Sequence, residues 1–409
     1  MSGCGAEKGL MSIDDALAQI QSQAKALATE QLALPHCLNR YLAKAVYSAV
    51  NLPSFSQSAV DGYAINSILE NLQDVVFEVT GEIKAGSESH QQLQDGQAIR
   101  IFTGGKIPVG TTHVARQEIV TIEANSRIRI TEHIKAQADI RFTGEEVTSG
   151  QLLADVGQKI NIGALAALSM AGVQYLDVFA LPKVAVVITG DEVAESAADL
   201  QAGKVFDANG PLLKAWLNDY GIVVEILHIA DEAEHVSQCF ERLKQQYDLI
   251  ITTGGVSVGD YDFVRPCAFE TGFEQIFWKV KQKPGKPLFF AVYRQSHHSC
   301  YLLGLPGNPA AVYVAMQIYG KTLLDALQNN QAPLQWFSAV LTHELKSDAR
   351  ERFLRMQAFF EQGQLKVQSL PKQQSHMLSN LMHANCLVRI PANIKLDAGQ
   401  TLTGVFIHN

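Results

Sequence analysis

The sequence predicts a multidomain α/β protein whose centre is a doubly wound sheet, with an N-terminal mixed domain, an inserted β-rich domain and a small C-terminal β-barrel. The central prediction comes from strand and helix patterns that alternate over residues 182–330. This alternation is typical of a parallel sheet covered on both faces. The β-rich predictions come from short alternating apolar runs broken by Gly, Ser, Asn and Asp over 51–142, and from short strand patterns over 331–409.

The N-terminal residues predict two helices. Ser12 followed by Asp15 resembles a capping box, and the apolar residues that follow recur at helical spacing. A second helix is predicted over about 35–50, ending at Pro53. A strand and a short helix capped by Asn161 follow the inserted β-rich domain. We therefore expect four domains, with the boundaries 7–50 plus 143–181, 51–142, 182–330 and 331–409.

The predicted α/β domain begins at about Pro182. Its helices begin near Asn209, which is read as an N-cap, near Glu232 and after Pro309. Its strands are predicted at 183–189, 223–229 and 249–252. The terminal domain has strand patterns at 337–345, 352–360, 364–367, 386–390 and 401–406.

The most informative stretch lies where a buried strand enters a loop rich in glycine and acids. It reads Asp248-Leu-Ile-Ile-Thr-Thr-Gly-Gly-Val-Ser-Val-Gly-Asp-Tyr-Asp262. Glycines let the backbone approach a ligand and turn N–H groups toward anionic oxygens, and carboxylates attract a hard divalent cation. Alone, the loop is equally compatible with a tight strand-to-helix turn. However, the strands of Lys183–Glu192 and Cys300–Pro309 end in comparable loops, which indicates one composite site at one sheet edge.

Charged residues near these loops are further candidates. The run Trp278-Lys-Val-Lys-Gln-Lys-Pro-Gly-Lys-Pro287 places Lys279, Lys281 and Lys283 on one face if the backbone is extended. An anion would relieve their mutual repulsion, but a solvated edge strand protected by lysines accounts for the run equally well. The acids near strand ends are Asp191, Glu192, Asp231, Asp260 and Asp262. Together they can converge on one Mg²⁺, but any one of them taken alone is better explained as a turn or cap residue, Asp231 as the cap of the helix at 232–247.

Composition excludes several classes of protein. The net charge of −8 argues against nucleic acid as a partner, because phosphates need a basic face. The six scattered cysteines form no Cys-x-x-Cys pair, which fits reduced thiols in the cytoplasm. No apolar stretch is long enough for a bilayer, so no membrane association is expected. The sequence contains no Walker motif.

Six motifs, taken in order, resemble the molybdopterin molybdenumtransferase family of molybdenum cofactor biosynthesis, which includes the C-terminal domain of gephyrin. The resemblance covers essentially the whole chain. No single motif is decisive, and the glycine loop alone would also suit a molybdopterin adenylyltransferase. The motifs are Ser58-Ala-Val-Asp-Gly-Tyr-Ala64, Thr103-Gly-Gly-Lys-Ile-Pro108, Thr189-Gly-Asp-Glu192, Gly254-Gly-Val-Ser-Val-Gly-Asp-Tyr-Asp262, Lys283-Pro-Gly-Lys-Pro287 and Gly304-Leu-Pro-Gly-Asn-Pro309.

The resemblance implies an L-shaped, cytoplasmic homodimer with a central domain of the molybdopterin-binding type. It implies that adenylylated molybdopterin and molybdate react with Mg²⁺ present and that AMP is released. Molybdopterin adenylyltransferase and molybdoenzymes are the implied partners. The family's functional positions fall on Asp61, Thr103, Glu192, Asp231, Asp262, Lys279, Lys283, Pro306, Pro309, Arg355 and Ser375.

Among these positions, Asp61 and Thr103 imply that one subunit completes the site of its partner. We assign Asp61, Glu192, Asp231 and Asp262 to catalysis. Glu192 and Asp262 are also the candidate metal ligands. The loops add Gly254, Gly255, Ser257 and Lys286 as candidates for binding anionic substrate.

Some departures from the family pattern and some alternatives remain. Gln374-Ser-His376 stands where the family usually has Gly-Ser-His, so Ser375 is the weakest assignment. A non-catalytic scaffold on this fold would need no complete set of carboxylates. An adenylyltransferase would consist of little more than the α/β domain. Tungstate resembles molybdate in size and charge, and the sequence does not separate the two.

Overall fold

The computed structural model describes residues 10–87, 91–190, 193–194, 198, 204–257 and 262–407. The chain forms two compact units. One unit combines Met1–Glu30 with Phe179–Asn409, and the other comprises Gln31–Val178. This division into two units does not test the four predicted domain boundaries, which stay predictions.

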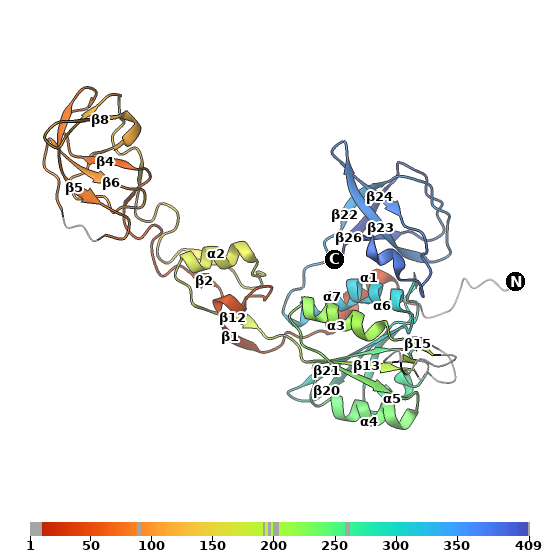
Figure 1. Cartoon of the computed structure of the whole chain (residues 1–409). Helices are drawn as coiled ribbons and strands as arrows, with labels where there is room; N and C mark the ends of the chain where they lie inside the picture. The colour runs from red at the N-terminus through yellow and green to blue at the C-terminus, as the bar shows by residue number, and fades with distance from the viewer. Residues whose placement is uncertain are drawn as a thin grey trace. The chain divides into compact units, whose positions relative to one another are not determined.

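The first unit contains a six-stranded sheet with the order β16-β13-β17-β21-β20-β18 (Figure 1). The first four strands of this order are parallel, as the sequence predicts. In contrast, β20 and β18 run antiparallel, because β20 and β21 form a hairpin that needs only a short turn. The strands are β13 (Val184–Thr189), β16 (Glu225–Ile229), β17 (Leu249–Thr253), β18 (Glu274–Trp278), β20 (Phe289–Arg294) and β21 (Ser299–Leu305).

Helices cover both faces of this sheet (Figure 1). Val184, Val186 and Ile188 of β13 pack with α1, α3, α6 and α7, whereas Ala185 and Val187 pack with α4 and α5. The strand is therefore apolar on both faces from Val184 to Ile188, as expected for a doubly wound sheet. The helices are α1 (Ile13–Gln23), α3 (Asn209–Asp219), α4 (Ala233–Leu243), α5 (Val264–Glu270), α6 (Pro309–Ala315) and α7 (Lys321–Leu327), with a π-helical turn, Met316–Gly320, joining α6 to α7.

Helix α1 confirms the predicted start at Ser12. The Ser12 side chain accepts a hydrogen bond from the Asp15 N–H at 3.0 Å, which satisfies one of the free donors of the first turn. Ile13, Ala16 and Ile20 are fully buried in the same core as the helices of the α/β sheet. The N-terminal helix therefore packs on the α/β layer.

The C-terminal strands close into a five-stranded barrel in the order β23-β24-β22-β26-β25, with β25 pairing back to β23. Every predicted strand of this region is present. The short strand β19 (Gln282–Lys283) adds to the edge of β23 in parallel. The barrel strands are β22 (Phe337–Leu341), β23 (Glu351–Glu361), β24 (Gln364–Ser369), β25 (Cys386–Ile390) and β26 (Thr401–Phe406).

The second unit contains a six-stranded sheet with the order β7-β4-β6-β5-β9-β8. Only β5 and β6 are parallel neighbours within it. Three two-stranded sheets accompany it: β1 (Thr29–Ala33) with β12 (Tyr175–Phe179), β2 (Val46–Tyr47) with β11 (Leu152–Ala154), and β3 (Gln57–Ser58) with β10 (Ile140–Arg141). The large sheet consists of β4 (Gly62–Ile65), β5 (Val76–Ile83), β6 (Gln97–Ile101), β7 (His113–Arg116), β8 (Val120–Glu123) and β9 (Arg127–Ile130).

The helix predicted over 35–50 is wrong. The chain forms one 3₁₀ turn, Leu34–His36, and then runs extended. Tyr41 and Leu42 make β-bridges to Lys159 and Val178. Partners more than 100 residues away thus replace the local hydrogen bonds of a helix, and Leu42 becomes fully buried among them. The short helix α2 (Ile162–Met170) is present as predicted, and the side chain of Asn161 caps it.

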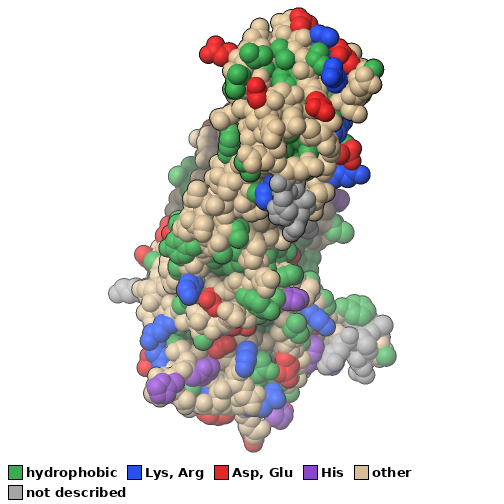
Figure 2. Space-filling view, turned by 90° about the vertical axis from the view of Figure 1, so that its left-hand side faces the viewer, with side chains coloured by type: hydrophobic (Ala, Val, Ile, Leu, Met, Phe, Trp, Pro, Cys, Tyr) green, Lys and Arg blue, Asp and Glu red, His purple; other side chains and the backbone are tan. Residues whose placement is uncertain are grey.

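The surface shown in Figure 2 mixes acidic and basic side chains, as expected for a chain of modest net charge. None of the helices in the described parts of the chain has the length and apolarity needed to cross a membrane. The five cysteines within those parts are free and buried, as predicted for reduced thiols: Cys37, Cys239, Cys267, Cys300 and Cys386.

Candidate functional site

The carboxyl ends of three central strands lie side by side. In register, Ile188 of β13 pairs with Thr253 of β17, and Thr253 pairs with Leu305 of β21. The Thr189 hydroxyl donates to the Thr253 carbonyl at 3.3 Å, and the Gly254 N–H donates to the Leu305 carbonyl at 3.1 Å. The three loops that the sequence singles out therefore leave the sheet at one edge, where open α/β sheets bind ligands.

The glycine loop requires its first two glycines. Gly254 and Gly255 have φ angles of +89° and +63°, which side chains rarely adopt. A Cβ on Gly254 would lie 2.8 Å from the Thr189 hydroxyl, and one on Gly255 would lie 2.8 Å from a Val264 methyl. Ser257, the last described residue of this loop, is exposed. The sequence thus brings bare backbone to the edge of the sheet.

The turn after β21 is held by two neighbouring segments. The Asn209 amide group donates to the Gly307 carbonyl at 2.9 Å. Asn209 is the first residue of α3 and not the cap that the sequence predicts; the N-cap is Ala208, and the preceding Asp207 accepts from the Asn209 N–H at 2.9 Å. Pro309 begins α6. Together with Pro306, it fixes the backbone of a turn that adjoins the glycine loop.

Ser375 reaches this turn from the barrel. Its carbonyl accepts a hydrogen bond from the Ala310 N–H at 3.0 Å, in the first turn of α6. The Ser375 loop thus lies against the start of α6, which begins at Pro309. Their roles in binding substrate stay predictions.

Arg355 lies inside the barrel wall and holds the loop that carries Ser375. Only 1% of Arg355 is exposed. Its guanidinium donates to the carbonyls of Lys372 and Gln374, each at 3.1 Å, and to that of Met377. Burial lowers the pKa of Arg355. In this structure Arg355 therefore acts on the loop backbone, and its predicted contact with an anion stays a prediction.

Trp278 connects the end of β18 to the glycine loop. Its indole N–H donates to the Val256 carbonyl at 2.9 Å. Two cations lie over its ring, with the Lys279 ammonium 4.1 Å and the Arg265 guanidinium 4.2 Å from the centroid. Sequence reasoning identified Lys279 but missed Trp278 and Arg265, because a single aromatic residue and a helical arginine carry no motif.

Lys279, Lys281 and Lys283 would share one face only in a fully extended segment, and this condition is not met at Lys279. Lys279 has a φ of +69°, so the backbone turns there and the alternation of an extended strand is interrupted. Lys281 and Lys283 flank the fully buried Gln282. The Lys283 ammonium lies 2.8 Å from the Asp348 carboxylate. Lys286 is partly buried and engaged in an interaction of its own.

The acidic candidates are only partly described. Asp231 follows β16, and Asp262 precedes α5; both are partly buried and both have interactions. The N-cap of α4 is Glu232, so Asp231 does not cap that helix. Asp191, Glu192 and Asp260 lie outside the described residues. Within the described residues no three His, Cys, Asp or Glu side chains converge. The Asp262 carboxylate is the kind of donor that Mg²⁺ takes, singly or in pairs.

The second unit brings Asp61 and Thr103 together. The Asp61 carboxylate accepts hydrogen bonds from the backbone N–H and the hydroxyl of Thr103, both at 2.8 Å. These two bonds hold the pKa of Asp61 below its usual value, with help from the charge of Arg100. The two residues come from different strand ends, so their pairing shows that both motifs form one polar cluster.

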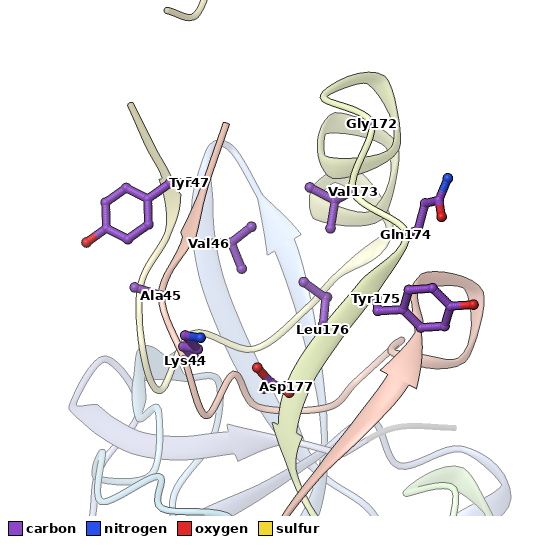
Figure 3. Close-up of a pocket in the computed structure, with 10 residues that line it drawn as sticks. All are labelled: Lys44, Ala45, Val46, Tyr47, Gly172, Val173, Gln174, Tyr175, Leu176 and Asp177. Atoms are coloured by element: carbon purple, nitrogen blue, oxygen red, sulfur yellow. The ribbon is translucent and has the colours of Figure 1, made fainter. Parts of the chain in front are cut away.

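The second unit also has an open hollow of about 450 Å³. In Figure 3, Tyr47 and Tyr175 lie on opposite sides of it, and Val46, Val173 and Leu176 lie between them. Tyr47 and Tyr175 are 58% and 59% exposed. None of the predicted site residues lines this hollow, so it is separate from the strand-end site.

Three family models together match most of the chain. The model described as MoeA N-terminal region (domain I and II) matches residues 11–172. The model of a probable molybdopterin binding domain matches residues 185–326, and that of the MoeA C-terminal region (domain IV) matches residues 338–403. The carboxyl ends of β13, β17 and β21 all lie within the match to the molybdopterin binding domain.

Relatives match over nearly their full length. A protein of Haemophilus influenzae named molybdopterin molybdenumtransferase is 33% identical, covering 96% of this chain and 98% of its own. One of the same name from Staphylococcus epidermidis is 31% identical, covering 94% of this chain and 92% of its own. The crystal structure of a molybdopterin biosynthesis MoeA protein from Pyrococcus horikoshii is similar in fold, with a TM-score of 0.80, 23% identity, and coverage of 97% and 100%. The chain therefore belongs to the molybdopterin molybdenumtransferase family.

Proposed function

We propose that the protein inserts molybdate into adenylylated molybdopterin and releases AMP. The observation that carries the proposal is the meeting of three parallel strand ends at glycine-rich turns, inside the segment matched by the molybdopterin-binding model. The relatives that carry the transferase name support the same reaction. The proposed substrates are thus a pterin diphosphate and a tetrahedral oxyanion.

Each part of the candidate site has a chemical task in this proposal. Backbone amides of Gly255 and Ser257 bind anionic oxygens, and Gly254, whose own N–H donates to the Leu305 carbonyl, shapes the loop through its positive φ. Lys279, Lys283 and Lys286 supply positive charge in an acidic chain. Pro306 and Pro309 keep the adjoining turn rigid, and Arg355 fixes the loop of Ser375.

We further propose that Glu192 and Asp262 hold Mg²⁺, while Asp231 orients water beside them. Bound Mg²⁺ supplies neutralisation of the diphosphate, which makes AMP a better leaving group. We expect Glu192→Ala to abolish molybdenum insertion and to leave the oligomer folded. Turnover measures the insertion reaction, and light scattering measures whether the oligomer is intact. Near-normal turnover in this variant would contradict the role assigned to Glu192.

We propose a cytoplasmic homodimer in which Asp61 and Thr103 complete the site of the partner subunit. Exposed apolar side chains on the second unit offer a contact surface for another copy: Tyr47, Leu152, Ile162 and Tyr175. Molybdopterin adenylyltransferase and molybdoenzymes are the proposed partners for receiving substrate and delivering product.

Shared sites can be tested by complementation. Asp61→Ala and Asp262→Ala should each be inactive as homodimers. A mixed dimer of the two should recover activity, because one of its two sites combines an intact Asp61 with an intact Asp262. Activity that stays absent in purified mixed dimers contradicts a site shared between subunits.

The reaction itself is tested by single-turnover release of AMP from adenylylated molybdopterin, with and without molybdate and Mg²⁺. Release that requires both, with cofactor formed, is the expected result. Tight binding without release would identify a scaffold that has kept the fold without the chemistry. A parallel run with tungstate measures the metal preference.

A further inference from the structure

The Lys283 ammonium, assigned above to binding anionic substrate, is paired with a carboxylate from the barrel. Its Nζ lies 2.8 Å from Oδ2 of Asp348. The Lys283 side chain is 51% exposed and that of Asp348 is 21% exposed. Asp348 is absent from every motif in the sequence that points to function. The contact therefore joins a residue of the candidate site to one with no assigned task.

Both partners are held by their backbones. Lys283 belongs to β19, which pairs with the start of β23 so that Lys283 lies beside Arg352. The other carboxylate oxygen of Asp348, Oδ1, accepts from the Arg350 N–H at 3.1 Å, and the Asp348 carbonyl accepts from the Asn393 N–H at 2.7 Å. Asp348 thus stands fixed at the place where the Lys283 side chain ends.

The carboxylate is charged at neutral pH. Burial alone would raise the pKa of Asp348, but hydrogen bonds from Lys283 and from the Arg350 N–H, together with the positive charges of Lys283 and Arg352, outweigh burial and lower it. The Lys283 ammonium is thus balanced by a full negative charge rather than by a neutral acceptor. Any anion that binds Lys283 directly meets this carboxylate first.

We propose that Asp348 is the resident counter-ion of Lys283 and sets the affinity of this lysine for the anionic oxygens of the substrate. The proposal rests on the function proposed above only in taking Lys283 as an anion-binding residue. An entering oxyanion or diphosphate exchanges with the carboxylate, so the ammonium group keeps one charged partner throughout. The same competition weakens binding and eases release.

The size of the effect follows from the exposure of the pair. Ion pairs that are this accessible to water change an equilibrium by about two- to five-fold. A carboxylate held so weakly can be displaced by a dianion. The change in anion affinity when the carboxylate is removed by substitution is nevertheless large enough to measure.

Asp348→Asn is the sharpest variant, because it removes the charge and keeps an oxygen for the Arg350 N–H. We expect this variant to bind molybdate or inorganic pyrophosphate about two- to five-fold more tightly, by calorimetry at low salt. A gain for molybdate assigns Lys283 to the oxyanion, and a gain for pyrophosphate assigns it to the diphosphate. Unchanged or weaker binding of both anions, with an unaltered thermal midpoint, overturns the proposal.

Two control variants separate the loss of this ion pair from a general change in charge. Glu361→Gln removes an exposed carboxylate that pairs with Lys366 at the opposite end of β23. An equal gain in this variant would mean a general effect of net charge and would also overturn the proposal. Lys283→Ala should abolish the gain when combined with Asp348→Asn. If the asparagine variant does not fold, Asp348→Ser repeats the test, since its hydroxyl can also accept from the Arg350 N–H.

Failure of the proposed function can be told apart from failure of this inference. A wild-type protein that releases no AMP with molybdate and Mg²⁺ contradicts the transferase reaction. The binding comparison between the wild type and Asp348→Asn needs no turnover, and it is decided by calorimetry alone.

Discussion

At the scale of single residues, glycine decides where backbone and ligand can meet. In the second unit, Gly62 leaves no room for a side chain, since a Cβ there would lie 1.9 Å from the Ala115 carbonyl of the adjoining strand. That glycine serves close strand packing beside Asp61. Gly254 differs because it combines a left-handed backbone with a close neighbour at the edge of the sheet. The first glycine is therefore structural, and the second places backbone N–H groups at the site.

We expect Gly254→Ala to slow AMP release at least about ten-fold, which corresponds to about 1.4 kcal/mol. The methyl group would force the Thr189 hydroxyl away and reshape the loop. Gly221→Ala is the matched control. Gly221 also has a positive φ, +76°, but its Cβ would meet Leu181 only at 3.6 Å. Rates of single-turnover release compare the two, and an equal loss in both would show that backbone strain alone matters.

At the scale of elements, local pattern predicted most of the strands and helices, including strands whose partners in the sheet are distant in sequence. The α/β strands and helices follow from apolar runs and caps, and the meeting of three strand ends follows from their being parallel. The helix expected at 35–50 failed because Tyr41 and Leu42 bond to segments distant in sequence. Lys283 was predicted as a site residue, but its ion pair was not, since Asp348 lies 65 positions further along. The positive φ of Lys279 also carries no signal in the local pattern.

Trp278, at the end of β18, donates a hydrogen bond from its indole N–H to the Val256 carbonyl of the glycine loop. We expect Trp278→Phe to raise the KM for adenylylated molybdopterin several-fold with little change in kcat, because a neutral hydrogen bond contributes about 0.5–1.5 kcal/mol. Trp336→Phe is the control, because Trp336 stacks on Phe353 in the barrel region. Steady-state kinetics at varied substrate concentrations distinguish the two variants. Equal KM values in all three proteins would show that the indole N–H does not position the loop.

At the scale of the whole molecule, ion pairs join segments that are distant in sequence within each unit. In the first unit, Arg389 donates to Asp14 of α1 and to Glu351 of β23, and it lies over the ring of Trp336. In the second unit, Arg116 donates two hydrogen bonds to Asp139, at 2.7 and 2.8 Å. Because each unit has its own carboxylates of lowered pKa, acid is expected to weaken both units separately.

The Arg116–Asp139 pair shows how acid is expected to lower the stability of the second unit, and it allows a test. The hydrogen bond from Arg116 is the largest cause of the lowered pKa of Asp139. A carboxylate with a lowered folded pKa stabilises the fold above its unfolded pKa of about 3.9, and this contribution is lost as pH falls through the folded value. Because the Arg116 side chain is 58% exposed, we expect only about 1 kcal/mol or less. Hydrogen exchange of β7 and β10 amides in the full chain, compared between pH 6 and pH 3, measures the loss. In Asp139→Asn, protection of these amides should already be lower at pH 6 and should fall less between pH 6 and pH 3. If it falls as much as in the wild type, the acid-sensitive carboxylate is not Asp139.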